Sequence, residues 1–133
     1  MRILVVDADF ATRDFLSAAL KSEGHQVIAV GDIHNAHVAL SAWRPHLVVA
    51  DLDLIDAMGW GFLRDHPRPD SSWPPVLMYS VEDPATLKRM EDAARRIGAC
   101  CFLRKPFKLD ELFGALALCE SRTESGDDAV GLV

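Results

Sequence analysis

Four polar side chains lie at or just after the ends of short apolar runs, and their types suit chemistry on a phosphoryl group. They belong to Asp7, Asp51, Ser80 and Lys105. Carboxylates are ligands that Mg²⁺ prefers, and the ion completes its shell with water or phosphate oxygens. A lysine and a hydroxyl beside such an ion can hold phosphoryl oxygens. A carboxylate can attack phosphorus to give an acyl phosphate. These residue types therefore predict phosphoryl transfer to a carboxylate, provided that the fold brings them together.

The elements that must position these residues can be predicted from the pattern of apolar side chains. Five apolar runs predict strands over residues 3–6, 26–30, 47–50, 76–79 and 100–103. Helical spacing predicts helices over residues 10–23, 33–43, 57–65 and 84–97, and a last one marked by Leu109, Leu112, Phe113 and Leu116. The first helix has an apolar stripe of Phe15, Leu16, Ala19 and Leu20. Strands and helices therefore alternate along the chain.

The helix ends carry signals of their own. Asp32 and Asp83 are suitable N-cap residues, and Pro84 suits the first helical position. Gly24 and Gly98 follow two predicted helices as stop residues. Each strand is apolar on both faces, so we expect a parallel sheet with helices on both faces. The fold class is α/β, a flavodoxin-like doubly wound five-stranded sheet of order 2-1-3-4-5. The four polar residues would meet at the carboxyl edge of that sheet.

Length and charge restrict the kind of protein. The 133 residues suit one compact domain, and the net charge of −6 disfavours direct binding to nucleic acid. Residues 1–120 are expected to form the domain. Residues 121–133 are rich in Ser, Gly, Asp and Glu, which predicts a flexible acidic tail or the stump of a linker. No segment has the length or pattern of a transmembrane span or a signal peptide, so a cytoplasmic protein without membrane contact is expected.

The three cysteines, Cys100, Cys101 and Cys119, show no metal-ligand spacing. Their odd number favours reduced thiols in the core.

Taken in order, four segments resemble the receiver domains of two-component signalling, and the resemblance covers residues 1 to about 119. The first-strand acidic motif is similar to ILVVDAD, and the phosphoacceptor segment to PHLVVADLDLIDAMGWGFL. The strand that ends in a hydroxyl residue resembles PVLMYS, and the final strand with its lysine resembles GACCFLRKPF. Lys105 precedes Pro106, which suggests a fixed cis peptide bond; the alternative is a proline at a helix start.

The resemblance implies a role for each site residue. Asp51 would accept the phosphoryl group, and Ser80 and Lys105 would bind it. Mg²⁺ would be held by Asp7, Asp51 and the backbone carbonyl of Asp53, and Phe102 would be the aromatic switch. The implied donor is a histidine kinase or a phosphotransfer protein, and the implied recipient of the signal is an output protein or domain. A receiver of this kind is not an enzyme.

One departure from the family pattern favours a second hypothesis. Receivers usually carry two adjacent acids after the first strand, and here the second is Ala8, which implies weaker Mg²⁺ binding. Asp9 is more simply the N-cap of the first helix. Phe102 also lacks the hydroxyl of the commoner tyrosine. A phosphorylation-independent pseudo-receiver, acting only as an interaction module, therefore stays open.

A third hypothesis comes from another class. Asp7 and Asp9 have the D-x-D spacing of haloacid-dehalogenase-like phosphatases, and Ser80 and Lys105 would fill two further motifs. This hypothesis lacks a late strand ending in paired acids, because Asp127-Asp128 lie in the polar tail. It also gives Asp51 and Asp53 no role.

The last helix has apolar residues beyond its core stripe: Ala115, Ala117, Leu118 and Cys119. Such a patch favours an interface, and we expect any homodimer through the last two helices to be mainly hydrophobic. Packing beneath the tail is the alternative.

Overall fold

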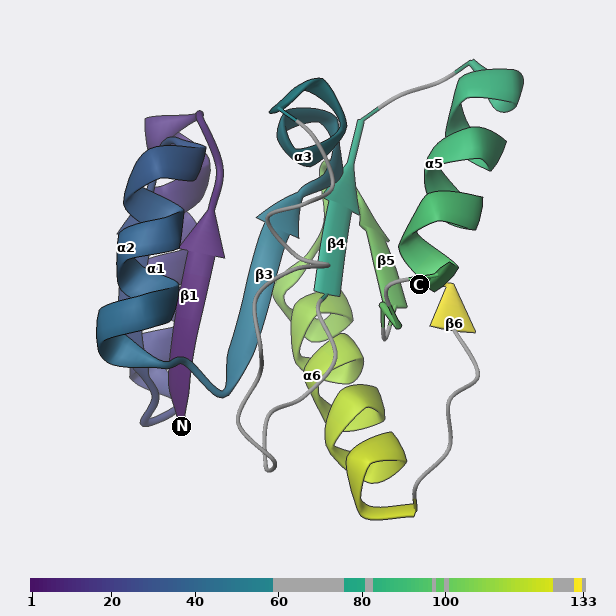
Figure 1. Ribbon diagram of the computed structural model, residues 1–133. Coiled ribbons are helices and arrows are strands. Elements are labelled where there is room, and N and C mark those ends of the chain that lie inside the picture. The colour runs from purple at the N-terminus through teal and green to yellow at the C-terminus, as the bar shows by residue number, and fades with distance from the viewer. Residues whose placement is uncertain (59–75, 81–82, 97, 100, 126–130, 133) are drawn as a thin grey trace.

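The strands described in this computed structural model join one parallel sheet, in the order β2-β1-β3-β4-β5-β6 (Figure 1). The structure describes residues 1–58, 76–80, 83–96, 98–99, 101–125 and 131–132, and for 56–58, 101, 120–125 and 131–132 it describes the backbone alone. The strands are β1 (Arg2–Val6), β2 (Gln26–Val30), β3 (Leu47–Asp51), β4 (Val76–Tyr79), β5 (Cys101–Arg104) and β6 (Gly131–Leu132). The predicted order 2-1-3-4-5 is confirmed, and β6 extends it beside β5.

Helices cover both faces of the sheet, as expected for a doubly wound fold (Figure 1). The described helices are α1 (Phe10–Ser22), α2 (Ile33–Trp43), α3 (Leu52–Met58), α5 (Pro84–Arg96) and α6 (Leu109–Ser125). One core cluster joins α1 and α6 to alternate strand residues such as Val5 and Leu103. A second joins α2, α3 and α5 to the intervening residues, such as Val6 and Phe102. This alternation is the period of two that places successive strand side chains on opposite faces.

The predicted helix-end signals are confirmed. The carboxylates of Asp9, Asp32 and Asp83 each accept a hydrogen bond from the backbone N–H three residues on, at 3.1, 2.7 and 3.1 Å. Gly24 and Gly98 have φ of 89° and 78°, in the left-handed region where glycine ends a helix without strain. The Lys105-Pro106 peptide bond is cis.

Two helix boundaries differ from the sequence prediction. The third helix begins at Leu52 rather than near residue 57, since the Asp51 carboxylate accepts a hydrogen bond from the Asp53 N–H at 3.0 Å and Leu52 and Ile55 are fully buried. The rest of the predicted 57–65 helix lies outside the described residues. The last helix continues to Ser125, past residue 121 where the tail was predicted to begin, because no glycine or proline interrupts residues 115–125.

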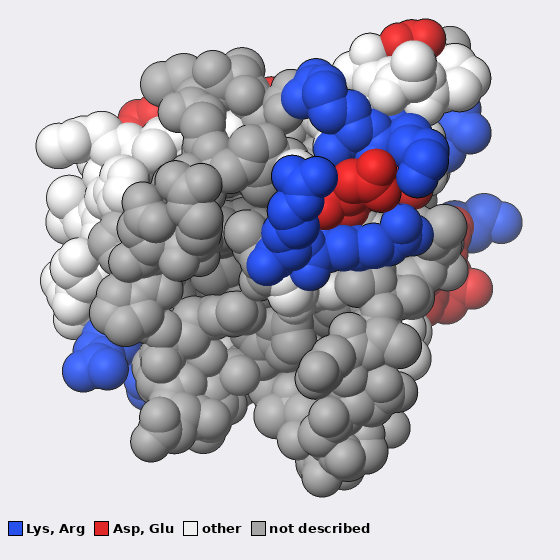
Figure 2. Space-filling view, turned by 45° about the vertical axis from the view of Figure 1, so that its right-hand side comes forward, with Lys and Arg blue, Asp and Glu red and all other residues white. Residues whose placement is uncertain are grey.

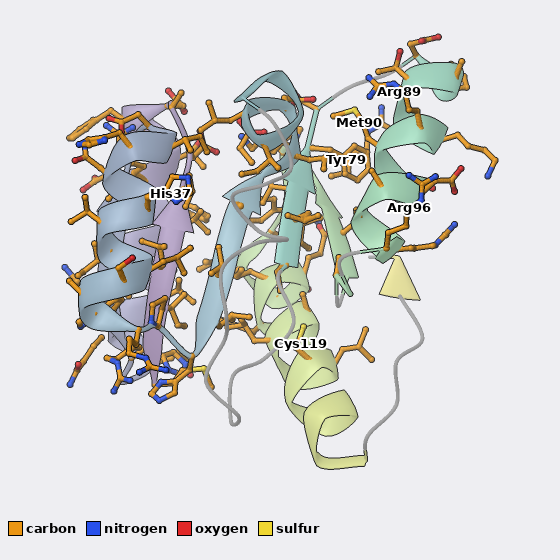
Figure 3. The ribbon with its side chains drawn as sticks, in the orientation of Figure 1. His37, Tyr79, Arg89, Met90, Arg96 and Cys119 are labelled. Atoms are coloured by element: carbon orange, nitrogen blue, oxygen red, sulfur yellow. The ribbon has the colours of Figure 1, made fainter. Side chains whose placement is uncertain are left out.

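Several side-chain expectations also need correction. Phe15 is 43% exposed, because it lies at the edge of the α1 stripe and packs beside Phe107. Ala115 and Cys119 are fully buried in the α1–α6 core, so only Ala117 and Leu118 of the predicted patch are exposed, whereas Leu109 of the predicted core stripe is 42% exposed at the start of α6. Cys119 (Figure 3) is disulfide-bonded rather than a reduced thiol. Sequence spacing could not show this bond, since it depends on how the packed elements place their sulfur atoms.

Within the described part of the chain, no helix has the length and apolarity needed to cross a membrane.

Candidate functional site

The carboxyl ends of the central strands meet at one edge of the sheet. Val6 lies opposite Ala50, Asp51 opposite Met78, and Tyr79 opposite Arg104 in the parallel register. Backbone hydrogen bonds continue the pairing just past the strand ends, from Asp7 N–H to the Val30 carbonyl at 3.1 Å and from Lys105 N–H to the Tyr79 carbonyl at 2.8 Å. The four polar residues singled out in the sequence therefore lie at or just after the ends of neighbouring strands at this edge.

The Lys105 ammonium joins two of these side chains. Its Nζ lies 2.6 Å from Asp7 Oδ2 and 3.4 Å from Asp51 Oδ2. The side chains of Asp7, Asp51 and Lys105 are 1%, 14% and 20% exposed, so this ion cluster is largely shielded from water. Two carboxylates against one ammonium leave a net negative charge, which favours a further cation.

The other oxygens of the two carboxylates accept backbone hydrogen bonds. Asp7 Oδ1 accepts from the Asp9 N–H at 2.8 Å, and Asp51 Oδ1 accepts from the Asp53 N–H at 3.0 Å. In both cases the donor is two residues further along the chain, at the turn into the following helix. Each carboxylate is thereby fixed by its own loop as well as by Lys105.

Ser80 pairs with Asp53 in the described structure. Its hydroxyl donates to Asp53 Oδ2 at 2.8 Å, and its backbone N–H donates to the same oxygen at 3.3 Å. Ser80 is thus at the expected edge, but its hydroxyl is directed at Asp53. The sequence reasoning assigned Asp53 a role only through its backbone carbonyl.

Burial and neighbouring charges set the protonation of the cluster. Burial raises the pKa of the Asp51 carboxyl, the Lys105 ammonium opposes the rise, and the charge of Asp7 adds to it. Burial acts to lower the pKa of Lys105, but the hydrogen bond to Asp7 and the charge of Asp51 outweigh it, so the pKa of Lys105 is raised. The Asp51 carboxyl therefore lies beside a cation that stays charged.

The side chains at this edge include the carboxylate ligands that Mg²⁺ prefers, but they are few. Asp7 and Asp51 offer carboxylate oxygens side by side, which are ligands that Mg²⁺ prefers. Ala8 offers no donor, and the Asp53 carboxylate is engaged by Ser80. Among the side chains that the structure describes, no three His, Cys, Asp or Glu residues are grouped to hold a metal ion. An ion here would depend on two carboxylates and a backbone carbonyl.

The side chains of Asp9 and Phe102 make their contacts outside the ion cluster. The Asp9 carboxylate accepts hydrogen bonds from the Thr12 N–H at 3.1 Å and hydroxyl at 2.7 Å, so it is occupied as the cap of α1. That contact gives no support to Asp9 as a general acid of a phosphatase. Phe102 is fully buried in the core cluster between the sheet and α2, α3 and α5.

Sequence reasoning missed two features beside the site. A cavity of about 470 Å³ adjoins Ser80 and Lys105, and its other lining residues are Ala11, Thr12, Phe15, Pro106 and Phe107. The Arg13 guanidinium lies over the Phe10 ring and donates to the Asp7 carbonyl at 2.7 Å. The exposed side chains of Phe10 and Phe15 could have indicated these two features. A single sequence, however, does not show which aromatic residues are exposed.

Comparisons with known proteins agree with this architecture. The family model described as the response regulator receiver domain matches residues 3–117. The DNA-binding response regulator MtrA of Mycolicibacterium paratuberculosis is 33% identical over 127 residues, covering 96% of this chain and 53% of MtrA. The virulence transcriptional regulatory protein PhoP of Salmonella typhimurium is 29% identical over 118 residues, covering 87% of this chain and 50% of PhoP. The chain thus spans about half the length of these curated relatives.

Solved structures show the same fold. A signal receiver domain from Bermanella marisrubri superposes with a TM-score of 0.72 at 25% identity, over 90% of this chain and 97% of that one. NtrX from Brucella abortus has a TM-score of 0.72 at 30% identity, over 95% of this chain and 28% of NtrX. The chain belongs to the response regulator receiver domain family of two-component signalling systems.

Proposed function

We propose that this receiver takes a phosphoryl group on the Asp51 carboxylate and passes the change to an output partner. The observation that supports this role best is the Lys105 ammonium shared between Asp7 and Asp51 at the carboxyl edge of the sheet. It supplies a fixed positive charge beside a carboxylate of raised pKa. Phosphoryl transfer requires mainly charge neutralisation and an in-line nucleophile.

The proposed transfer breaks one bond and forms one. An Asp51 carboxylate oxygen attacks the phosphorus of a phosphohistidine, the P–N bond breaks, and its electron pair stays on the imidazole nitrogen. The product is an acyl phosphate on Asp51. Lys105 is then placed to hold a phosphoryl oxygen, and the Ser80 hydroxyl can join it after leaving Asp53. Mg²⁺ would be held by Asp7, Asp51 and the Asp53 carbonyl, and when bound it would neutralise phosphoryl charge.

The proposed partners follow from the family. The donor is a histidine kinase or a phosphotransfer protein, and the recipient is an output protein or domain reached through Phe102 as the switch residue. Residues 1–120 would act as the receiver, and 121–133, which include the end of α6 and the short strand β6, as the tail or linker, in the cytoplasm. The relatives named as DNA-binding or transcriptional regulators are about twice as long as this chain. With a net charge of −6, this chain is not expected to bind nucleic acid directly.

Mass spectrometry after incubation with acetyl phosphate and Mg²⁺ tests the phosphoacceptor. We expect one phosphoryl adduct, mapped to Asp51 and absent from Asp51→Asn. Asp92→Asn, which changes an exposed carboxylate of α5, is the matched control and should keep the adduct. The Ala8→Asp variant, which restores the pair of adjacent acids at positions 7 and 8, is tested in parallel. The proposal fails if neither chain forms an adduct, which would favour the pseudo-receiver. Steady turnover of a chromogenic phosphate ester would instead favour the phosphatase.

A further inference from the structure

The Ser80 hydroxyl is already committed in the described structure. Asp53 Oδ2 accepts both the hydroxyl hydrogen bond at 2.8 Å and that of the Ser80 backbone N–H at 3.3 Å. Asp53 is half-buried in the first turn of α3, two residues after Asp51, whereas Ser80 is exposed at the end of β4. One carboxylate oxygen therefore holds both donors of Ser80.

This arrangement sets up a competition. A serine hydroxyl has a single proton to donate, so Ser80 cannot donate to Asp53 and to a phosphoryl oxygen on Asp51 at once. Lys105 differs, because an ammonium has three protons and already reaches both Asp7 and Asp51. Of the two phosphoryl-binding side chains, Ser80 is the one that must give up a bond.

We infer that Asp53 is a positioning residue that holds Ser80 in its resting orientation and opposes phosphoryl binding at Asp51. This rests on the proposed function. When a phosphoryl group arrives, the Ser80 hydroxyl leaves a charged acceptor, and the Asp53 carboxylate is returned to water. Hydrogen bonds to charged groups are among the stronger ones, so their loss offsets part of the new contact. The resting hydrogen bond thus lowers the affinity of the site for a phosphoryl group.

Removal of Asp53 alone would not prove this, because it also removes a negative charge that repels a phosphoryl group. The two effects separate in a cycle with Ser80→Ala. Charge repulsion acts with or without the serine hydroxyl, whereas the hold on Ser80 needs it. Asp53→Ala keeps the backbone carbonyl that was expected to bind Mg²⁺, so the metal donor set is unchanged by the substitution.

The experiment is a titration with beryllofluoride, a phosphoryl analogue, at saturating Mg²⁺, followed by amide NMR. Asp53→Ala should tighten analogue binding about tenfold more in the wild-type background than in the Ser80→Ala background. Asp53→Asn keeps an acceptor oxygen without the charge. Its effect on analogue affinity should therefore differ less between the wild-type and Ser80→Ala backgrounds. Asp92→Ala, an exposed control on α5, should leave the affinity unchanged.

A second measurement reports on the hydrogen bond directly. Without analogue, the Ser80 amide proton resonance should move upfield in Asp53→Ala, as expected when an amide loses a charged acceptor. Equal effects of Asp53→Ala in both backgrounds, or an unmoved Ser80 amide, would overturn the positioning role. Failure of the proposed function looks different: the folded wild type and Ala8→Asp would neither bind the analogue nor form an adduct with acetyl phosphate.

Discussion

At the scale of single residues, Ala8 is the position that most distinguishes this site. It is exposed next to Asp7, whose side chain is 1% exposed and bound to Lys105. The carboxylate that receivers usually carry here would face the same edge of the sheet as Asp7 and Asp51. Its absence removes one negative charge from the place where a divalent cation would bind.

Ala8→Asp should therefore tighten Mg²⁺ binding by about tenfold. A unit charge about 4 Å from a divalent ion is worth roughly 2 kcal/mol even at the dielectric constant of water, and repulsion from Asp7 and Asp51 removes part of that gain. Isothermal titration with Mg²⁺ measures the change. The yield of the Asp51 adduct from acetyl phosphate should rise in parallel, and Ala8→Asp combined with Asp51→Asn should form none.

Ala8→Asn is the matched control, because asparagine has nearly the shape of aspartate without its charge. Its affinity for Mg²⁺ should rise much less than that of Ala8→Asp. Unchanged Mg²⁺ affinity in Ala8→Asp would mean that the ion is held by other groups or that the domain works without one.

How far the site could be predicted also depends on the residue. The sequence could place Asp7, Asp51, Ser80 and Lys105 together because each lies at or just after the end of a strand, and parallel strands end at one edge. The partner of Ser80 could not be predicted, because it depends on the rotamer of Asp53 in a turn whose helix starts earlier than the sequence suggested.

At the scale of elements, hydrogen bonds tie the start of β1 to the segment between α2 and β3. The Arg2 N–H donates to His46 Nδ1 at 2.9 Å, and the His46 N–H donates to the Arg2 carbonyl at 2.8 Å. The Arg2 guanidinium donates to the carbonyls of Trp43 and Arg44 at 3.2 and 2.9 Å. Burial, then Arg2 and the N-terminal amine, lowers the pKa of His46.

This link should make folding stability depend on pH. Because the pKa of His46 is lowered in the fold, the neutral ring is favoured there. The contribution of neutral His46 to folding stability is fully present above the ordinary histidine pKa of 6.5. It is lost as the pH falls below that value toward the lower pKa of the folded state. The free energy of unfolding, measured with urea from pH 7 to pH 5, should decline. His46→Asn keeps an acceptor for the Arg2 N–H without a titrating ring, so its decline should be shallower.

His34→Asn changes an exposed histidine of α2 and should follow the wild-type pH dependence. If His46→Asn also shows the wild-type pH dependence, then titration of His46 does not cause the pH dependence of folding stability.

Strands and helix caps could be predicted at this scale because their signals are local. Short apolar runs and Asp residues before helices need no knowledge of the rest of the chain, and they gave β1 to β5 and the caps of α1, α2 and α5. The start of α3 and the exposure of Phe15 depend on contacts with distant segments. Such contacts are absent from a single sequence.

At the scale of the whole molecule, two outer surfaces bear on self-association. The α5 side is cationic: exposed Lys88, Arg89, Arg95 and Arg96 on α5, with Arg104 on β5, gather around a few acids, as Figure 2 shows. Asp92 pairs with Lys88 at 3.3 Å and with Arg95 at 3.6 Å. Beneath them, Met90 and Tyr79 pack between α5 and the sheet (Figure 3). On α6 the apolar patch predicted from the sequence is reduced to Ala117 and Leu118, and Leu109 is exposed at the start of the helix.

A homodimer through α5 and α6 stays a prediction, and its salt dependence should be distinctive. A two-fold interface brings the same surface of both copies together, so the cationic α5 sides would repel each other. Added salt screens that repulsion and favours the apolar contact, so association measured by light scattering should strengthen with salt. Leu118→Ser should weaken the dimer. Val38→Ser, which changes an exposed side chain on α2 outside the proposed interface, should not. A monomer at every salt concentration would count against the dimer.

The hydrogen bonds around Asp51 have a thermodynamic consequence. Lys105, Ser80 and the loop amides all have acceptors in the described site, and no buried side-chain nitrogen or oxygen that the structure describes lacks a partner. An incoming anion must therefore take the Ser80 hydroxyl and the loop amides from their present acceptors, although Lys105 has a third proton to donate, and an exchange of similar bonds changes the free energy little. Where two conformations are closely balanced, modest differences in affinity can shift their populations. The protein bound to this domain would then decide, as much as the phosphoryl group does, which conformation prevails.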